Sequence, residues 1–175
     1  MDILYTEIEI QKRVQELAEE ISEDYEGEEV IVVGILKGAF IFTADLVRHL
    51  TCKNIIDFMD VSSYGSGTIS SGKITLDKDL TCDPKGRHVI LVEDLIDTGN
   101  TLQWIKEYLQ SKDTKSVKIC CLLDKDVKRK NYIDVDYVGF KCPNEFVVGY
   151  GMDYDGAYRN CPHVGILHPE VYQNK

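Results

Sequence analysis

Three carboxylates stand within five positions of the stretch VILVEDLIDTGNTL, which runs from Val89 to Leu102. β-Branched and apolar residues lead into Glu93 and Asp94, and Asp97 follows two further apolar residues. Because burial makes a charge costly, carboxylates at the end of a buried strand indicate a functional site. Vicinal carboxylates can accept hydrogen bonds from two neighbouring hydroxyls, as on a ribose, or hold a hydrated Mg²⁺. Glu93 and Asp94 are therefore candidate sugar or metal ligands, with a solvated acidic loop as the alternative.

The next residues, Asp97-Thr98-Gly99-Asn100-Thr101, lie where a strand gives way to a helix. Anions bind at such junctions, because free backbone N–H groups and the helix dipole point there. Gly99 lets the backbone approach a phosphate closely, and the hydroxyls of Thr98 and Thr101 can donate to its oxygens. Simple helix capping by Asp97 or Thr98 is the competing interpretation. Together with the carboxylate pair, the segment predicts a site for a phosphorylated ribose with an acid or base near its reactive carbon.

The rest of the chain predicts a sheet that could position these residues. Thr6 and Glu9 form a capping box ahead of apolar residues at helical spacing, which predicts a first helix. Continuous apolar runs then alternate with helical segments, a pattern typical of a parallel sheet covered on both faces. We therefore predict a doubly wound α/β core. Its expected strands are 30–36, 54–64, 87–94, 116–124 and 135–140, and its expected helices include 39–50 and 101–110.

Two regions depart from this alternation. Residues 62–73 read SSYGSGTISSGK, which is rich in Gly and Ser and predicts a mobile loop inside the domain. After Cys142-Pro143 the pattern becomes short and irregular. A chain of 175 residues with 43% apolar residues suits one core, and no linker to a second domain is visible. We therefore expect residues 1–175 to form a single domain.

Composition restricts the partners. The chain has 20 lysines and arginines against 30 aspartates and glutamates, a net charge of −10. Such a field repels nucleic acid and anionic membranes, so a phosphate-bearing ligand must be held by local groups or a metal. The six cysteines include no C-x-x-C pair, the N-terminus lacks the order of a signal peptide, and no apolar run approaches the length of a membrane span. We expect a reduced, cytoplasmic protein.

The stretch VILVEDLIDTGNTL closely resembles the phosphoribosyl diphosphate (PRPP) binding motif of type I phosphoribosyltransferases, and nearly the whole chain resembles the hypoxanthine-guanine phosphoribosyltransferase family. The segments GILKGAF, SSYGSG, LLDKD, DYVGF, EFVVGYGMDY and YRN occur in the family's order and spacing. The resemblance implies a mostly parallel sheet flanked by helices, a small hood from the chain ends and a flexible active-site loop. It also implies purine salvage: transfer of the 5-phosphoribosyl group from PRPP to N9 of hypoxanthine or guanine, giving IMP or GMP and pyrophosphate.

By this resemblance, Glu93 and Asp94 would hold the ribose hydroxyls, and residues 97–101 would wrap the 5′-phosphate. Asp97 would also serve as general acid or base at N7 of the purine. Lys37 and Gly38 would lie in the pyrophosphate loop, with a cis peptide expected between Leu36 and Lys37. Arg159 resembles the family's pyrophosphate-contacting arginine, although by itself it would be an ordinary surface residue.

The base-binding residues are implied in the same way. Lys125 would donate to O6, which favours a 6-oxopurine over adenine because an ammonium has no acceptor. Phe146 would stack on the base, and the carbonyl of Val147 would accept from its edge. Asp153, beside the base, would join Glu93 and Asp94 in holding the implied cofactor, Mg²⁺. Ser63 and Tyr64 begin the loop that closes over the site in this family.

Some features leave alternatives open. Asn100 replaces the lysine of some members, and Cys161-Pro162 replaces a segment that often contains leucine. A type I transferase for xanthine or a pyrimidine would share the PRPP motif. An RNA-binding regulator on the same fold should be basic, and KDVKRK (125–130), the compact basic run, is better explained as a solvated loop. A nucleotide sensor would not need Asp97. The expected partners are PRPP and 6-oxopurines, without nucleic acid or membrane, and the family implies a homodimer or homotetramer.

Overall fold

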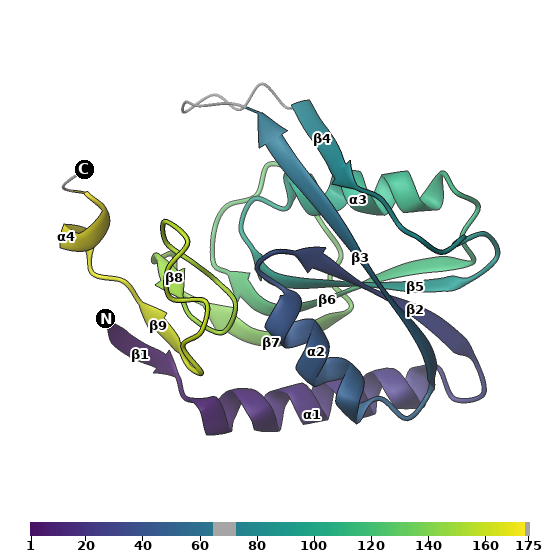
Figure 1. Ribbon diagram of the computed structural model, residues 1–175, viewed down its shortest axis with the longest axis horizontal. Coiled ribbons are helices and arrows are strands. Elements are labelled where there is room, and N and C mark those ends of the chain that lie inside the picture. The colour runs from purple at the N-terminus through teal and green to yellow at the C-terminus, as the bar shows by residue number, and fades with distance from the viewer. Residues whose placement is uncertain (65–72, 174–175) are drawn as a thin grey trace.

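The computed structural model describes residues 1–64 and 73–173, with a six-stranded sheet at its centre (Figure 1). The strand order is β4-β3-β2-β5-β6-β7, and all neighbours are parallel except β4, which pairs antiparallel with β3. The predicted doubly wound, mostly parallel sheet is confirmed. Its strands are β2 (Glu29–Leu36), β3 (Lys53–Tyr64), β4 (Lys73–Lys78), β5 (His88–Ile96), β6 (Ser116–Lys125) and β7 (Tyr137–Cys142).

Helices cover both faces of this sheet. Helix α1 (Glu7–Asp24) begins at the predicted capping box, in which Thr6 and Glu9 satisfy each other's backbone N–H groups. It packs with α2 (Phe40–His49) on one face of the sheet, while α3 (Asn100–Gln110) covers the other. Successive residues of a strand point to opposite faces, so the apolar run of β2 contributes to both cores. This explains why the central strands are apolar throughout.

The carboxyl ends of β2 and β5 meet where the chain reverses its direction across the sheet. From β2 the chain moves outward to β3, and it later returns to the other side of β2 to form β5, β6 and β7. The parallel register places Gly34 of β2 opposite Val92 of β5. In open α/β sheets, ligands bind outside the carboxyl ends of the strands at such a reversal. The topology therefore brings residues 36–38 to the predicted carboxylate pair.

A second, smaller sheet joins the two ends of the chain, as the hood implied by the resemblance requires. Strands β1 (Asp2–Tyr5), β9 (Val164–Ile166) and β8 (Val147–Val148) pair antiparallel in the order β1-β9-β8. Figure 1 shows this sheet and the short helix α4 (Pro169–Tyr172) together beside the main sheet. We did not predict β1 from the sequence, because the strand with which it pairs, β9, lies about 160 residues away along the chain.

The predicted loop at 62–73 is too long at both ends. Strand β3 continues to Tyr64 and β4 begins at Lys73, and the register pairs Ser62 with Thr75 and Ser63 with Ile74. At its first end the expected loop overlaps the expected strand 54–64, and the structure agrees with the strand; at its other end, pairing in the hairpin places Lys73 in β4. The remaining positions of the loop, 65–72, lie outside the described residues. All six cysteines are free, and the described part of the chain contains no helix with the length and hydropathy of a membrane span.

Candidate active site

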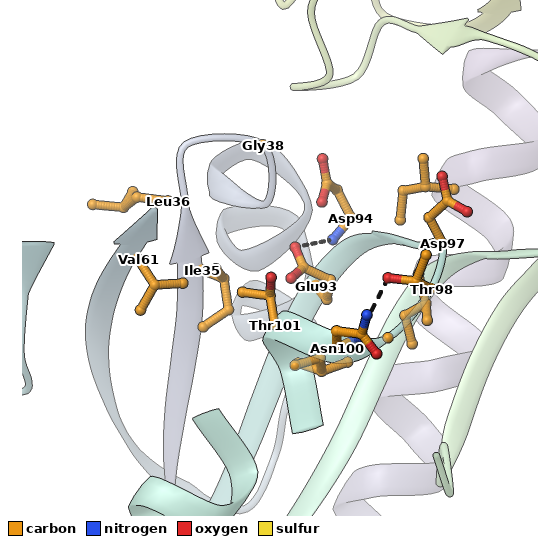
Figure 2. A pocket seen from close by; sticks show the side chains of 14 residues that line it. Ile35, Leu36, Gly38, Val61, Glu93, Asp94, Asp97, Thr98, Asn100 and Thr101 are labelled. Carbon is orange, nitrogen blue, oxygen red and sulfur yellow. Dashed lines mark hydrogen bonds between the residues drawn. The ribbon is translucent and has the colours of Figure 1, made fainter. Parts of the chain in front are cut away.

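The turn after β2 lies directly against the carboxylate pair at the end of β5 (Figure 2). A Cβ atom on Gly38 would lie 2.7 Å from Cγ of Asp94 and nearer still to its Oδ2 atom. The absence of a side chain at position 38 is therefore what allows this approach. The peptide between Leu36 and Lys37 is cis, as expected from the resemblance.

The segment after β5 forms an open helix terminus. Gly99 is the N-cap residue of α3 in a left-handed conformation, with φ of 80°, and no side chain caps this terminus within the described structure. The N-cap position belongs to Gly99 rather than to Asp97 or Thr98, and the competing capping interpretation rests on one long hydrogen bond, of 3.5 Å, from the Asn100 N–H to Thr98 Oγ1 (Figure 2). A cavity of about 300 Å³ lies here, and residues 97–101, which are predicted to bind a phosphate, all line it. The helix dipole and backbone N–H groups favour an anion at this position.

The carboxylate pair forms another wall of the same cavity. Glu93 is partly buried, and its Oε1 atom accepts a hydrogen bond of 3.1 Å from the Asp94 N–H. Burial raises the pKa of Glu93 well above its ordinary value, and the neighbouring Asp94 carboxylate raises that pKa further. A ligand that brings hydroxyl donors or a cation would therefore stabilise the ionised form of this crowded pair.

A second cavity, of about 450 Å³, adjoins the first. The two share Gly38, Asp94, Leu95 and Asp97 in their walls. The second cavity also brings together the residues that the resemblance assigns to the base and the pyrophosphate, which are Lys37, Lys125, Phe146, Val147, Asp153 and Arg159. Asp97 therefore stands at the junction of the two halves of the site.

Two charged groups face each other at this junction. Lys125 Nζ, at the end of β6, lies 3.7 Å from Asp97 Oδ2. The Asp97 side chain is 56% exposed, whereas that of Lys125 is 12% exposed. A planar heterocycle that offers one group to a carboxylate and a neighbouring oxygen to an ammonium would match this pair.

The hood supplies the opposite side of the second cavity. Arg159 binds the Asp153 carboxylate at 3.1 Å and donates to the Gly151 carbonyl at 2.7 Å. Gly151 has φ of 102°, and a Cβ atom there would overlap the Gly38 carbonyl oxygen, so the hood backbone touches the turn after β2. Phe146 immediately precedes β8 and stacks on Tyr172 with ring centroids 4.9 Å apart.

Comparison with known proteins agrees with this geometry. The family model of the phosphoribosyl transferase domain matches residues 2–155. The chain belongs to this family. Over 172 residues it is 46% identical to the hypoxanthine-guanine phosphoribosyltransferase of Bacillus subtilis, covering 98% of this chain and 96% of that protein. A crystal structure of a hypoxanthine phosphoribosyltransferase from Staphylococcus aureus superimposes with a TM-score of 0.95 at 46% identity, covering 99% of this chain and 95% of that one.

More distant and longer relatives belong to the same family. A structure of the Trypanosoma cruzi hypoxanthine phosphoribosyltransferase gives a TM-score of 0.93 at 39% identity, over 99% of this chain and 94% of that one. The bifunctional protein TilS/HprT of Listeria innocua is 49% identical over 170 residues, which are 97% of this chain and 26% of that protein. The chain thus spans about a quarter of the length of that curated relative.

Ser63, one of the two predicted lid residues in the described part of the chain, lies near residues 97–101. Ser63, near the end of β3, lines a third cavity of about 550 Å³ together with Thr98, Asn100 and Thr101. Tyr64 is the last residue of β3. The rest of the predicted lid, residues 65–72, lies outside the described part of the chain.

Sequence reasoning missed Arg129. We expected the basic run 125–130 to be solvated, and this holds for Lys128 and Lys130, but the Arg129 side chain is only 17% exposed and pairs with Asp124. Burial raises the pKa of Asp124, whereas hydrogen bonds from Lys141 and Arg129 lower it to a net value below the ordinary one. Arg129 lies in a basic run with no local signal of burial, and its partner Asp124 stands five residues earlier at the end of the expected strand, so the sequence could not reveal this pair.

Proposed function

We propose that this protein transfers the 5-phosphoribosyl group of PRPP to N9 of hypoxanthine or guanine, giving IMP or GMP and pyrophosphate in purine salvage. The observation that carries the proposal is the position of Asp97 between the two adjoining cavities, 3.7 Å from Lys125. The names of the relatives and the family membership support the same activity.

The first cavity would receive the phosphoribosyl group. The 5′-phosphate would bind the backbone N–H groups and hydroxyls of residues 97–101, at the uncapped start of α3. Glu93 and Asp94 would accept from the two ribose hydroxyls, which adds hydrogen-bond donors to this crowded pair. The leaving pyrophosphate would lie in the second cavity by Lys37, Gly38 and Arg159, of which Gly38 also lines the first cavity.

The second cavity would hold the base. Lys125 would donate to O6, Phe146 would cover one face of the ring, and the Val147 carbonyl and Asp153 would lie at its far edge. As the bond from N9 to the ribose carbon forms and the bond to the pyrophosphate oxygen breaks, Asp97 would accept the proton from N7. A 6-amino group would present a donor to Lys125, so adenine would leave that ammonium unpaired.

Mg²⁺ suits the carboxylates of this site. The described residues contain no cluster of three or more side chains that could hold a metal alone, so Glu93, Asp94 and Asp153 do not form a protein cage. Mg²⁺ is commonly held by one or two carboxylates plus substrate phosphates and water, and the crowded Glu93–Asp94 pair fits such a shared site. When bound, the ion would neutralise charge on the pyrophosphate.

The remaining expectations belong to the same proposal. Residues 1–175 form one phosphoribosyltransferase domain that acts in the cytoplasm as a homodimer or homotetramer. Ser63 and Tyr64 begin a lid that excludes water, because water would capture the oxocarbenium-like transition state. The net charge of −10 disfavours nucleic acid and anionic membranes as partners, and the anionic substrates would therefore be held by local groups and Mg²⁺.

Nucleotide formation from PRPP and Mg²⁺ with hypoxanthine, guanine, xanthine or adenine tests the proposal. Hypoxanthine or guanine should react, and adenine should react about 10⁴-fold less efficiently. Lys125→Met should remove much of this discrimination, while Lys128→Met, at an exposed neighbouring position, should leave it unchanged. If none of the four bases reacts, the proposed function is wrong, and equal rates with adenine would exclude the role of Lys125.

A further inference from the structure

The guanidinium of Arg129 joins two elements of the candidate active site through their backbones. Its Nε atom donates to the Asp97 carbonyl at 2.8 Å, and one terminal nitrogen donates to the Ile96 carbonyl at 3.2 Å. The same nitrogen reaches the Lys125 carbonyl at 3.3 Å and the Asp124 carboxylate. One side chain therefore binds the end of β5 and the end of β6 at once.

The anchor of this guanidinium is itself fixed. Asp124 is 7% exposed, and its second carboxylate oxygen accepts a hydrogen bond of 2.5 Å from Lys141 on the neighbouring strand β7. Arg129 is thus held by a largely buried ion pair with Asp124, and the Asp124 carboxylate is fixed in turn by Lys141 of β7. The nitrogen that binds Asp124 also donates to the Ile96 and Lys125 carbonyls, and Nε donates to the Asp97 carbonyl.

These carbonyl groups belong to the residues whose side chains meet in the active site. The Asp97 and Lys125 carbonyls are each one bond from the Cα atom that carries the functional side chain, and those side chains lie 3.7 Å apart. We propose that Arg129 is a positioning residue that sets the spacing between the Asp97 carboxylate and the Lys125 ammonium, an inference that rests on the proposed function. It thereby matches the pair to N7 and O6 of the purine before the base binds.

Arginine suits this role better than lysine does. A guanidinium offers five N–H donors in a rigid plane, so it can bind several carbonyls and a carboxylate in one fixed geometry. An ammonium keeps the charge beside Asp124 but concentrates its donors at one atom. Arg129→Lys therefore separates the two possible roles, because it preserves charge neutralisation and removes the link between β5 and β6.

Steady-state kinetics of wild type, Arg129→Lys and Arg129→Met would test this proposal, with PRPP and hypoxanthine varied separately. A misplacement of about 1 Å can reduce a rate about 10²-fold. We expect both variants to lose about 10- to 10²-fold in kcat/KM for hypoxanthine and to keep the KM for PRPP within about twofold. The ratio of hypoxanthine to adenine turnover should also fall. Lys128→Met serves as the matched control, since it removes a cation from the same segment at an exposed position.

Other outcomes would overturn the proposal. If Arg129→Lys keeps the wild-type kcat/KM for both substrates and the wild-type ratio of hypoxanthine to adenine turnover, Arg129 serves only to neutralise Asp124. If kcat/KM falls equally for PRPP and hypoxanthine, and falls in proportion to the melting temperature of the variants, Arg129 has a purely structural role. Inactive wild-type protein would overturn the proposed function and this inference together, whereas active wild type with unaffected variants would overturn this inference alone.

Discussion

Alanine at Gly38 should impair the enzyme by displacing Asp94. The added Cβ atom would lie 2.7 Å from Cγ of Asp94, whereas ordinary contacts begin at 3.4 Å. The carboxyl carbon must therefore move by about 0.7 Å, and the nearer Oδ2 atom by more. Rotation of a side-chain end costs little stability, but it takes the carboxylate away from the ribose hydroxyls that it is proposed to bind.

Initial rates with PRPP varied would measure this effect. A carboxylate misplaced by about 1 Å should lower kcat/KM for PRPP by about 10²-fold, or about 2.7 kcal/mol of transition-state stabilisation. The melting temperature should change little. Gly27→Ala is the matched control, because a Cβ atom there meets nothing within 4 Å. Its φ of 78° makes alanine strained, by about 1 to 2 kcal/mol, so this control should lose some stability and no activity.

A double-mutant cycle identifies the cause of the loss. If the added methyl group acts through Asp94, Gly38→Ala should cost far less in an Asp94→Ala background, where the clashing carboxylate has been removed. Additive losses would show that the methyl group harms some other contact. Wild-type kcat/KM for PRPP in a folded Gly38→Ala protein would refute the reasoning outright.

Three further predictions use other groups. Asp97→Asn should lower kcat by about 10² to 10⁴-fold while PRPP still binds by calorimetry, and near-normal turnover would exclude Asp97 as the general base. Burial raises the pKa of Asp57, but N–H donors of Cys82, Phe58 and Thr81 more than compensate and lower it to about 2 from 3.8. The unfolded chain therefore takes up this proton first on acidification, so the stabilisation, about 2 kcal/mol, is complete above about pH 5 and is lost as the pH falls toward 2. Asp57→Asn should accordingly flatten the dependence of unfolding free energy on pH in that range without changing kcat, and an unchanged pH profile would contradict this account. Chelation of Mg²⁺ should abolish turnover and leave the melting temperature of the free protein unchanged, because the metal is expected to bind with the substrate; a marked loss of stability would indicate a resident structural metal instead.

Local sequence was enough to predict much of the fold. The capping box at Thr6, the alternation of apolar runs with helical segments and the glycine at position 99 depend on interactions between neighbouring residues. Such interactions leave a pattern in the chain itself. For the same reason, the residue types at the junction between β5 and α3 are sufficient to predict an anion site, and the uncapped helix terminus is consistent with that prediction.

The contacts between distant segments were decided only by tertiary structure. Lys125, Phe146 and Arg159 have no local pattern that marks them, so their expected roles came from family resemblance, and folding brings them to one cavity. The hood pairs the two chain ends, Gly38 approaches Asp94, and the guanidinium of Arg129 is buried between the ends of two strands. Each depends on how sheets, helices and loops pack at ångström precision, and packing energy is summed over many contacts that no short stretch of sequence contains.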